Sequence, residues 1–219
     1  MCWNADVSLN TFLFSGFILL LIMYNNTFTK YKIQIINNIW AYLFVASVIF
    51  MQLIEFLIWK NIDNPFYNNL FSIFGSLLLV IQPMASLMLL TNIPLRNLLL
   101  TMYAFIVIPF SIYKFSISKI HSVISKNGHL TWKFLDGPLP WSFLDKSLLQ
   151  WSIWLFFFLF SFAYEQKWLW IICLLGTLAM SFINYWNDNT VGSMWCWMIN
   201  SLMIYYAFYL LLYLPFVKN

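Results

Sequence analysis

Two polar residues lie three positions apart inside a long apolar run of the chain, at Gln52 and Glu55. Glu55 is the only acidic residue within any of the long apolar runs. A carboxylate inside a bilayer costs several kcal/mol unless it is paired, protonated or hydrated, so it marks a functional site by default. In a helix this spacing places both side chains on one face. We expect Glu55 to take up a proton or to pair with a cationic group.

Amide side chains in other apolar runs extend this candidate site. Gln82, Asn184 and Asn200 each lie within a different run, and Asn184 has a predicted depth similar to that of Glu55. We expect these amides and the Glu55 carboxyl to converge on a cavity that opens to the outer side. The alternative is that the amides only bridge helices, a contribution of about 0.6 kcal/mol for each hydrogen bond.

Most of the 12 tryptophans fall on the half of the chain that we predict to face outward. They are Trp3, Trp59, Trp132, Trp141, Trp151, Trp154, Trp186, Trp195 and Trp197. We assign Trp59, Trp195 and Trp197 to the wall of the site, where aromatic rings could stack on a sugar, a sterol, an isoprenoid or an organic cation. The alternative is an interfacial aromatic belt.

His129 is the remaining candidate ligand-binding residue, and it could face Glu55 from a loop. The chain has only two histidines, too few for a closed zinc site without added carboxylates. No nucleophile with a base is identifiable, so we predict no catalytic residues, no metal and no cofactor.

The composition shows which elements must position these residues. The chain is 63% hydrophobic and 8% charged, with a mean hydropathy of +0.79, whereas soluble domains carry about 25% charged residues. Such a chain cannot cover its surface in water, so its solvent is lipid. The net charge of +4 is dispersed, which argues against nucleic acid as a partner. The three cysteines show no disulfide or metal-binding spacing.

The apolar runs predict an all-α membrane protein with seven transmembrane helices in one polytopic domain, residues 1–219. The helices are expected at about 8–24, 37–59, 67–90, 95–113, 147–163, 168–185 and 190–214. Each is close to the roughly 20 residues that a helix needs to cross hydrocarbon. The fifth and sixth runs are short and closely joined, so a re-entrant pair is the alternative there.

The segment 115–136, between the fourth and fifth runs, predicts a small β-hairpin over the outer end of the bundle. Polar and apolar residues alternate on both sides of Asn127-Gly128. An Asn-Gly pair between alternating runs is the strongest short-range hairpin signal. The stretch 136–141 is predicted to end the hairpin as a turn.

The charges of the short loops predict the orientation. On one side lie Lys30, Lys32, Arg96, Lys167 and the tail residue Lys218, and on the other lies Lys60 with Asp6, Asp63 and Asp188. The positive-inside rule then places the N-terminus outside or in the lumen and the C-terminus in the cytosol. The lysines of the 114–146 loop oppose this bias, and we exclude them because that loop has the pattern of a folded element.

The two halves of the chain resemble each other faintly. Residues 51–56 align with 180–185, and 74–76 align with 191–193, so runs one to three would repeat in runs five to seven. Seven spans in a three-plus-one-plus-three pattern resemble the layout of the SWEET sugar carriers, the PQ-loop transporters and the KDEL receptors. The Pro-Gln dipeptide of the PQ-loop group is missing, since Gln82-Pro83 has the reverse order.

In its short sequence stretches the chain more closely resembles multipass membrane proteins of large AT-rich DNA viruses. The stretches that prompt this resemblance are 1–4, 52–56, 128–132 and 192–197. This likeness would cover most of the chain, but it implies no known activity.

These features predict a membrane-embedded carrier or receptor for a small molecule, a sugar or a lipid, with Pro83 and Pro109 as helix breaks that permit rocking. A lipid-modifying enzyme that uses Glu55 with a loop histidine is one alternative. A structural protein that organises a membrane is the other. The balance of residues favours a non-enzyme and leaves the oligomeric state open.

Overall fold

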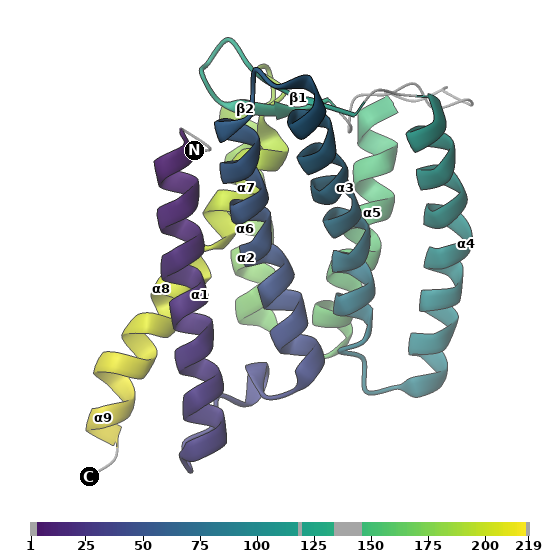
Figure 1. Ribbon diagram of the computed structural model, residues 1–219. Helices are drawn as coiled ribbons and strands as arrows, with labels where there is room; N and C mark the ends of the chain where they lie inside the picture. The colour runs from purple at the N-terminus through teal and green to yellow at the C-terminus, as the bar shows by residue number, and fades with distance from the viewer. Residues whose placement is uncertain (1–3, 118–119, 134–145, 218–219) are drawn as a thin grey trace.

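The computed structural model describes residues 4–117, 120–133 and 146–217, which form long helices with one small hairpin (Figure 1). The long helices are α1 (Ala5–Phe28), α2 (Ile39–Lys60), α3 (Pro65–Leu87), α4 (Ile93–Ile117), α5 (Lys146–Tyr164) and α6 (Trp168–Tyr185). A short 3₁₀ turn, η1 (Gln34–Ile36), joins α1 to α2. The last segment is divided into α7 (Val191–Ile199), α8 (Ser201–Phe208), the π-helical turn η2 (Tyr209–Tyr213) and α9 (Leu214–Val217).

Six segments of the described chain are long and apolar enough to cross a membrane. They are α1, α2, α3, residues 93–113 of α4, α6, and residues 191–216 taken together. The apolar part of α5 that was searched is shorter, Trp151–Tyr164. The prediction of a multipass all-α membrane protein is therefore confirmed, whereas the seventh span stays a prediction.

Asparagine side chains begin four of these helices. The Oδ1 atoms of Asn4, Asn38, Asn64 and Asn92 accept hydrogen bonds from backbone N–H groups in the first turns of α1, α2, α3 and α4. An N-cap satisfies a backbone donor that has no partner within the helix. At α3 the cap is followed by Pro65, whose missing N–H removes one more unsatisfied donor.

The helices pack in an order that surrounds α2 and α3. Helix α1 lies along α2, α2 along α3, and α3 along α5, while α7 packs on α6 and α8 on α1. Helix α4 stands at the edge of the bundle beside α3 (Figure 1). In the core, the ring of Phe44 contacts Phe158, Phe162 and Trp170 at centroid distances of 5.1–5.8 Å.

The prolines inside the helices do not break them. Helix α3 continues through Pro83 and α4 continues through Pro109. Pro83 has no N–H to bond the Leu79 carbonyl one turn earlier. The indole N–H of Trp154 on α5 donates to that oxygen at 2.7 Å, so the freed group is satisfied by a neighbouring helix. The discontinuity lies instead at Asn200, between α7 and α8.

The predicted hairpin is confirmed, with shorter strands than expected. β1 (Ser122–Ile124) pairs antiparallel with β2 (Leu130–Trp132). Ser125 and His129 close the turn through a 2.8 Å backbone hydrogen bond, and Gly128 has a φ of +78°. Helix α4 runs on to Ile117, past the predicted start at 115, and the predicted turn at 136–141 lies outside the described residues.

Candidate functional site

The polar pair predicted on α2 is fully buried. Gln52 and Glu55 both have 0% of their surface exposed. The Nε2 group of Gln52 donates to Oε2 of Glu55 at 2.8 Å, as the three-residue spacing on one helix face requires. The pair therefore forms one polar unit inside a segment of spanning length.

Glu55 lies where α2, α7 and the hairpin meet. Met51 and Ile58, which flank Glu55 on the same face of α2, belong to a buried cluster with Leu130 and Trp132 of β2. Cys196 of α7 joins this cluster. The carboxyl is thus covered by apolar side chains of the hairpin and not by solvent.

The hairpin is held on one side by the start of α3. Asn68 donates to the Ser122 carbonyl at 2.9 Å and accepts from the Ser122 N–H at 2.8 Å, as a neighbouring strand would. Its amide also donates to the Ile62 carbonyl at 3.0 Å. The hydroxyls of Ser72 and Ser122 lie 2.9 Å apart, and Asn69 donates to the Ile120 carbonyl at 2.6 Å.

The other side of the hairpin is held by the connection from α6 to α7. The Ser125 hydroxyl donates to the Asp188 carbonyl at 2.7 Å, and Asn127 donates to the Asp188 carboxylate at 3.0 Å. The Ser193 hydroxyl of α7 donates to the Leu130 carbonyl at 2.7 Å. Because both edges are bonded, the hairpin seals this end of the bundle in the observed state.

Gln82 and Asn200 both lie inside the bundle. The hydrogen bonds described for them go to backbone carbonyls and not to Glu55. Gln82 is buried and donates to the Ser47 carbonyl of α2 at 3.3 Å, which is a bridge between helices. Asn200 is buried at the α7–α8 discontinuity, where its amide donates to the Cys196 carbonyl at 2.8 Å.

Asn184 does not join the buried pair. Its side chain is exposed on α6 and donates to the Met180 carbonyl of its own helix at 2.7 Å. Glu55 is fully buried, so these two residues do not share an open cavity in this state.

The three predicted wall tryptophans lie in different environments. Trp195 is 2% exposed, its indole N–H donates to the Leu174 carbonyl at 3.1 Å, and its ring contacts Trp154 at 5.7 Å. Trp197 donates to the Thr11 hydroxyl of α1 at 3.1 Å. Trp59 is half-buried against the cluster that covers Glu55.

His129 is half-buried at the hairpin turn, with its ring 5.7 Å from that of Tyr185. Burial lowers the pKa of His129 below its usual value, and the nearby Asp188 carboxylate opposes this shift. The imidazole therefore packs as an aromatic side chain against α6.

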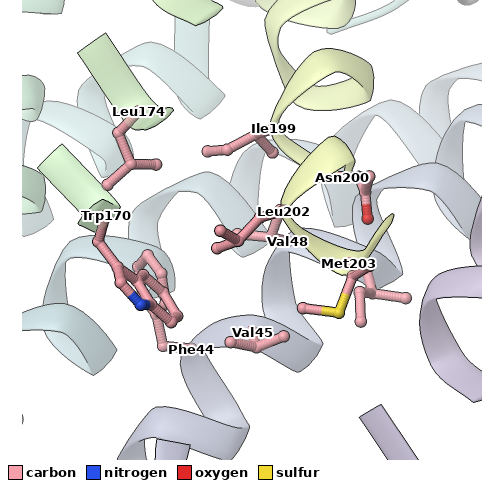
Figure 2. Close-up of a pocket in the computed structure, with 10 residues that line it drawn as sticks. Phe44, Val45, Val48, Trp170, Leu174, Ile199, Asn200, Leu202 and Met203 are labelled. Carbon is pink, nitrogen blue, oxygen red and sulfur yellow. The ribbon is translucent and has the colours of Figure 1, made fainter. Parts of the chain in front are cut away.

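A small cavity lies beneath Asn200, with a volume of about 20 Å³ (Figure 2). Figure 2 shows Asn200, Ile199, Leu202 and Met203 on one side, with Trp170 and Leu174 opposite them. Asn200 is the only amide among the lining residues, and the indole N–H of Trp170 donates to the Tyr206 hydroxyl at 3.1 Å.

Sequence reasoning missed Asn68, which bonds both the carbonyl and the N–H of Ser122 in the hairpin. The run Asn68-Asn69 near the start of a predicted span is a signal, because amides at a helix end bond neighbouring backbone. Ser193 gave no such signal, because serine is also common as a small residue at helix interfaces.

Among the described residues, no group of three or more His, Cys, Asp or Glu side chains could hold a metal ion. Comparisons of the chain with protein-family models, with curated proteins and with solved structures give no match. The resemblances to viral membrane proteins and to seven-helix carriers therefore stay predictions.

Proposed function

We propose that this protein is a membrane carrier that couples the movement of a small solute to a proton bound at Glu55. The observation that carries the proposal is a carboxyl with no exposed surface inside a segment of spanning length, bonded by Gln52. Ionisable groups in such positions are rare, and they mark proton and ion pathways.

The geometry suits a group that gains and loses a proton. An amide N–H can donate to a carboxylate oxygen and also, with a weaker bond, to the carbonyl oxygen of a carboxylic acid. The Gln52 bond to Oε2 can therefore persist in both states. Burial makes the neutral form far less costly than the charged one, so a change of charge at Glu55 requires a change of surroundings.

In this proposal the observed conformation is a closed state of the carrier. The bonded hairpin covers Glu55 at one end, and the aromatic core around Phe44 lies toward the other. The solute site opens when the hairpin end separates, and α5 serves as the seventh span. The helix discontinuity at Asn200 supports this proposal, because carriers commonly place broken helices at their substrate sites.

Proton movement into proteoliposomes with an entrapped pH-sensitive dye tests the proposal. The vesicles receive an inward proton gradient and a panel of neutral sugars, amino acids and quaternary amines. We expect solute-dependent acidification with the natural protein. Glu55→Gln should reduce it to the level of empty vesicles, because a glutamine side chain does not take up a proton.

Asn184→Ala is the matched control, since it removes a polar side chain that is exposed on α6. It should leave the acidification unchanged. Equal acidification with Glu55→Gln and with the natural protein would rule out Glu55 as the proton site.

A further inference from the structure

Several buried polar groups have no hydrogen-bond partner among the described residues, and four of them lie on α1, on α2 and at the α7–α8 junction. These four are the hydroxyls of Ser8 and Ser15, the Oε1 atom of Gln52 and the Oδ1 atom of Asn200. The first three residues have 0% of their surface exposed, and Asn200 has 5%. A buried polar atom without a partner costs about 1–3 kcal/mol, so four on neighbouring helices call for a ligand that satisfies them.

Helix packing brings Ser8 to the level of the Gln52–Glu55 pair, while Ser15 lies three residues from Phe12 in the opposite direction, away from the hairpin. Helix α1 runs antiparallel along α2 (Figure 1), and the rings of Phe12 and Phe50 contact each other at 5.7 Å. Ser8 lies one turn from Phe12 toward the hairpin. Gln52 and Glu55 lie two and five residues from Phe50 in the same direction.

Helix α7 closes the same region. Trp197 donates to the Thr11 hydroxyl at 3.1 Å, so α7 contacts α1 between Ser8 and Ser15. The Asn200 amide donates to the Cys196 carbonyl, and the Cys196 side chain belongs to the buried cluster that includes Met51 and Ile58 on either side of Glu55. The Oδ1 atom of Asn200 therefore lies about one helical turn from the Glu55 cluster.

The chemistry of these groups identifies the ligand. The two amide oxygens only accept hydrogen bonds, whereas each serine hydroxyl both donates and accepts. A metal ion would satisfy the acceptors but not the hydroxyl donors. Water donates two hydrogen bonds and accepts two, so it satisfies both kinds of group.

We propose that Ser8, Ser15, Gln52 and Asn200 bind internal water between α1, α2 and α7, and that this water hands the proton to Glu55. The first part is independent of transport, and the second part rests on the proposed function. The titratable residue of α7 in the cluster around Glu55 is Cys196, while α1 presents hydroxyls and its Asp6 is exposed. Below Asn200 the apolar lining of the cavity ends the polar region.

Radiolytic labelling in ¹⁸O-water tests the binding of water. Hydroxyl radicals formed from a bound water oxidise sulfur atoms next to it, and Met51 and Cys196 lie in the Glu55 cluster with exposures of 1% and 6%. We expect both side chains to take up ¹⁸O in the intact folded protein despite this burial. Absence of uptake at Met51 and Cys196 in the natural protein would overturn the proposal.

Ser8→Val and Ser15→Val provide the matched comparison, because a branched apolar side chain removes the hydroxyl and fills its space. Each should reduce ¹⁸O uptake at Met51 and Cys196, and undiminished uptake in both would show that these serines do not hold the water. If a variant fails to fold, the ¹⁸O labelling of the natural protein still tests whether water is bound.

The proton assay separates this inference from the proposed function. Slower acidification with Ser15→Val, together with full loss in Glu55→Gln, supports both. Labelled sulfurs with unchanged acidification in Glu55→Gln would leave the bound water standing and reject the carrier mechanism. Unlabelled sulfurs with acidification lost in Glu55→Gln would reject the water and keep the mechanism.

Discussion

Asn68 links the hairpin to the helices through one buried side chain. Its amide bonds both backbone groups of Ser122 and the carbonyl of Ile62. Asn26 does similar work at the other end of the bundle, where it bonds the Ile33 N–H, the Ile36 carbonyl and the Tyr42 hydroxyl. In both places an asparagine amide bonds backbone N–H and C=O groups that have no partner in a helix or a sheet.

Asn68→Ala should lower the free energy of unfolding by about 2–4 kcal/mol, because it leaves buried groups of Ser122 and Ile62 without partners. Asn69→Ala is the control at the next position, since it removes a single bond to the Ile120 carbonyl. Thermal unfolding in detergent, followed by reaction of the buried Cys196 thiol with a fluorogenic reagent, measures both. Equal effects of the two substitutions would contradict the role given to Asn68.

At the scale of elements, turn chemistry and helix caps follow local rules. The hairpin turn needs a residue with positive φ, and Gly128 supplies it at +78°. The four asparagine caps have the same local character. The position of a helix interruption is not set by local sequence in the same way. The helix continues through Pro83, where Trp154 bonds the freed carbonyl, and the interruption lies at Asn200.

Gly128→Ala should destabilise the protein by about 1–2 kcal/mol, since a side chain is disfavoured at positive φ. No atom lies within 4 Å of the added Cβ, so the effect comes from the backbone alone. Gly16→Ala in α1, which also has open space, should instead stabilise by about 0.5–1 kcal/mol through helix propensity. The same thermal assay compares them, and a stabilising Gly128→Ala would contradict the strained turn.

At the scale of the whole molecule, the charges divide between the two ends of the bundle. Lys30 lies two residues after the end of α1, Arg96 lies in the first turn of α4 and Lys167 precedes α6, and these helix ends lie opposite the hairpin (Figure 1). Large apolar side chains such as Phe105 at 78% exposed and Ile183 at 83% exposed cover the flanks between the ends. This distribution is what a lipid-embedded bundle requires.

The predicted orientation can be tested with single cysteines at the two ends. In a background without Cys2, Lys126→Cys at the hairpin turn should react with a membrane-impermeant maleimide on intact cells. Lys30→Cys should react only after permeabilisation, because the positive-inside rule places that end in the cytosol. The reverse pattern would show that the N-terminus faces the cytosol.

The sequence by itself determined the membrane class, the positions of the long helices to within a few residues, the hairpin and the unusual character of Glu55. Apolar run length and turn residues are local properties, so they can be read without a fold. The tertiary structure alone decided that Gln52 and Glu55 are sealed under the hairpin while Asn184 is exposed. In a membrane helix both the core and the lipid are apolar, so the pattern of residues does not reveal which face is buried.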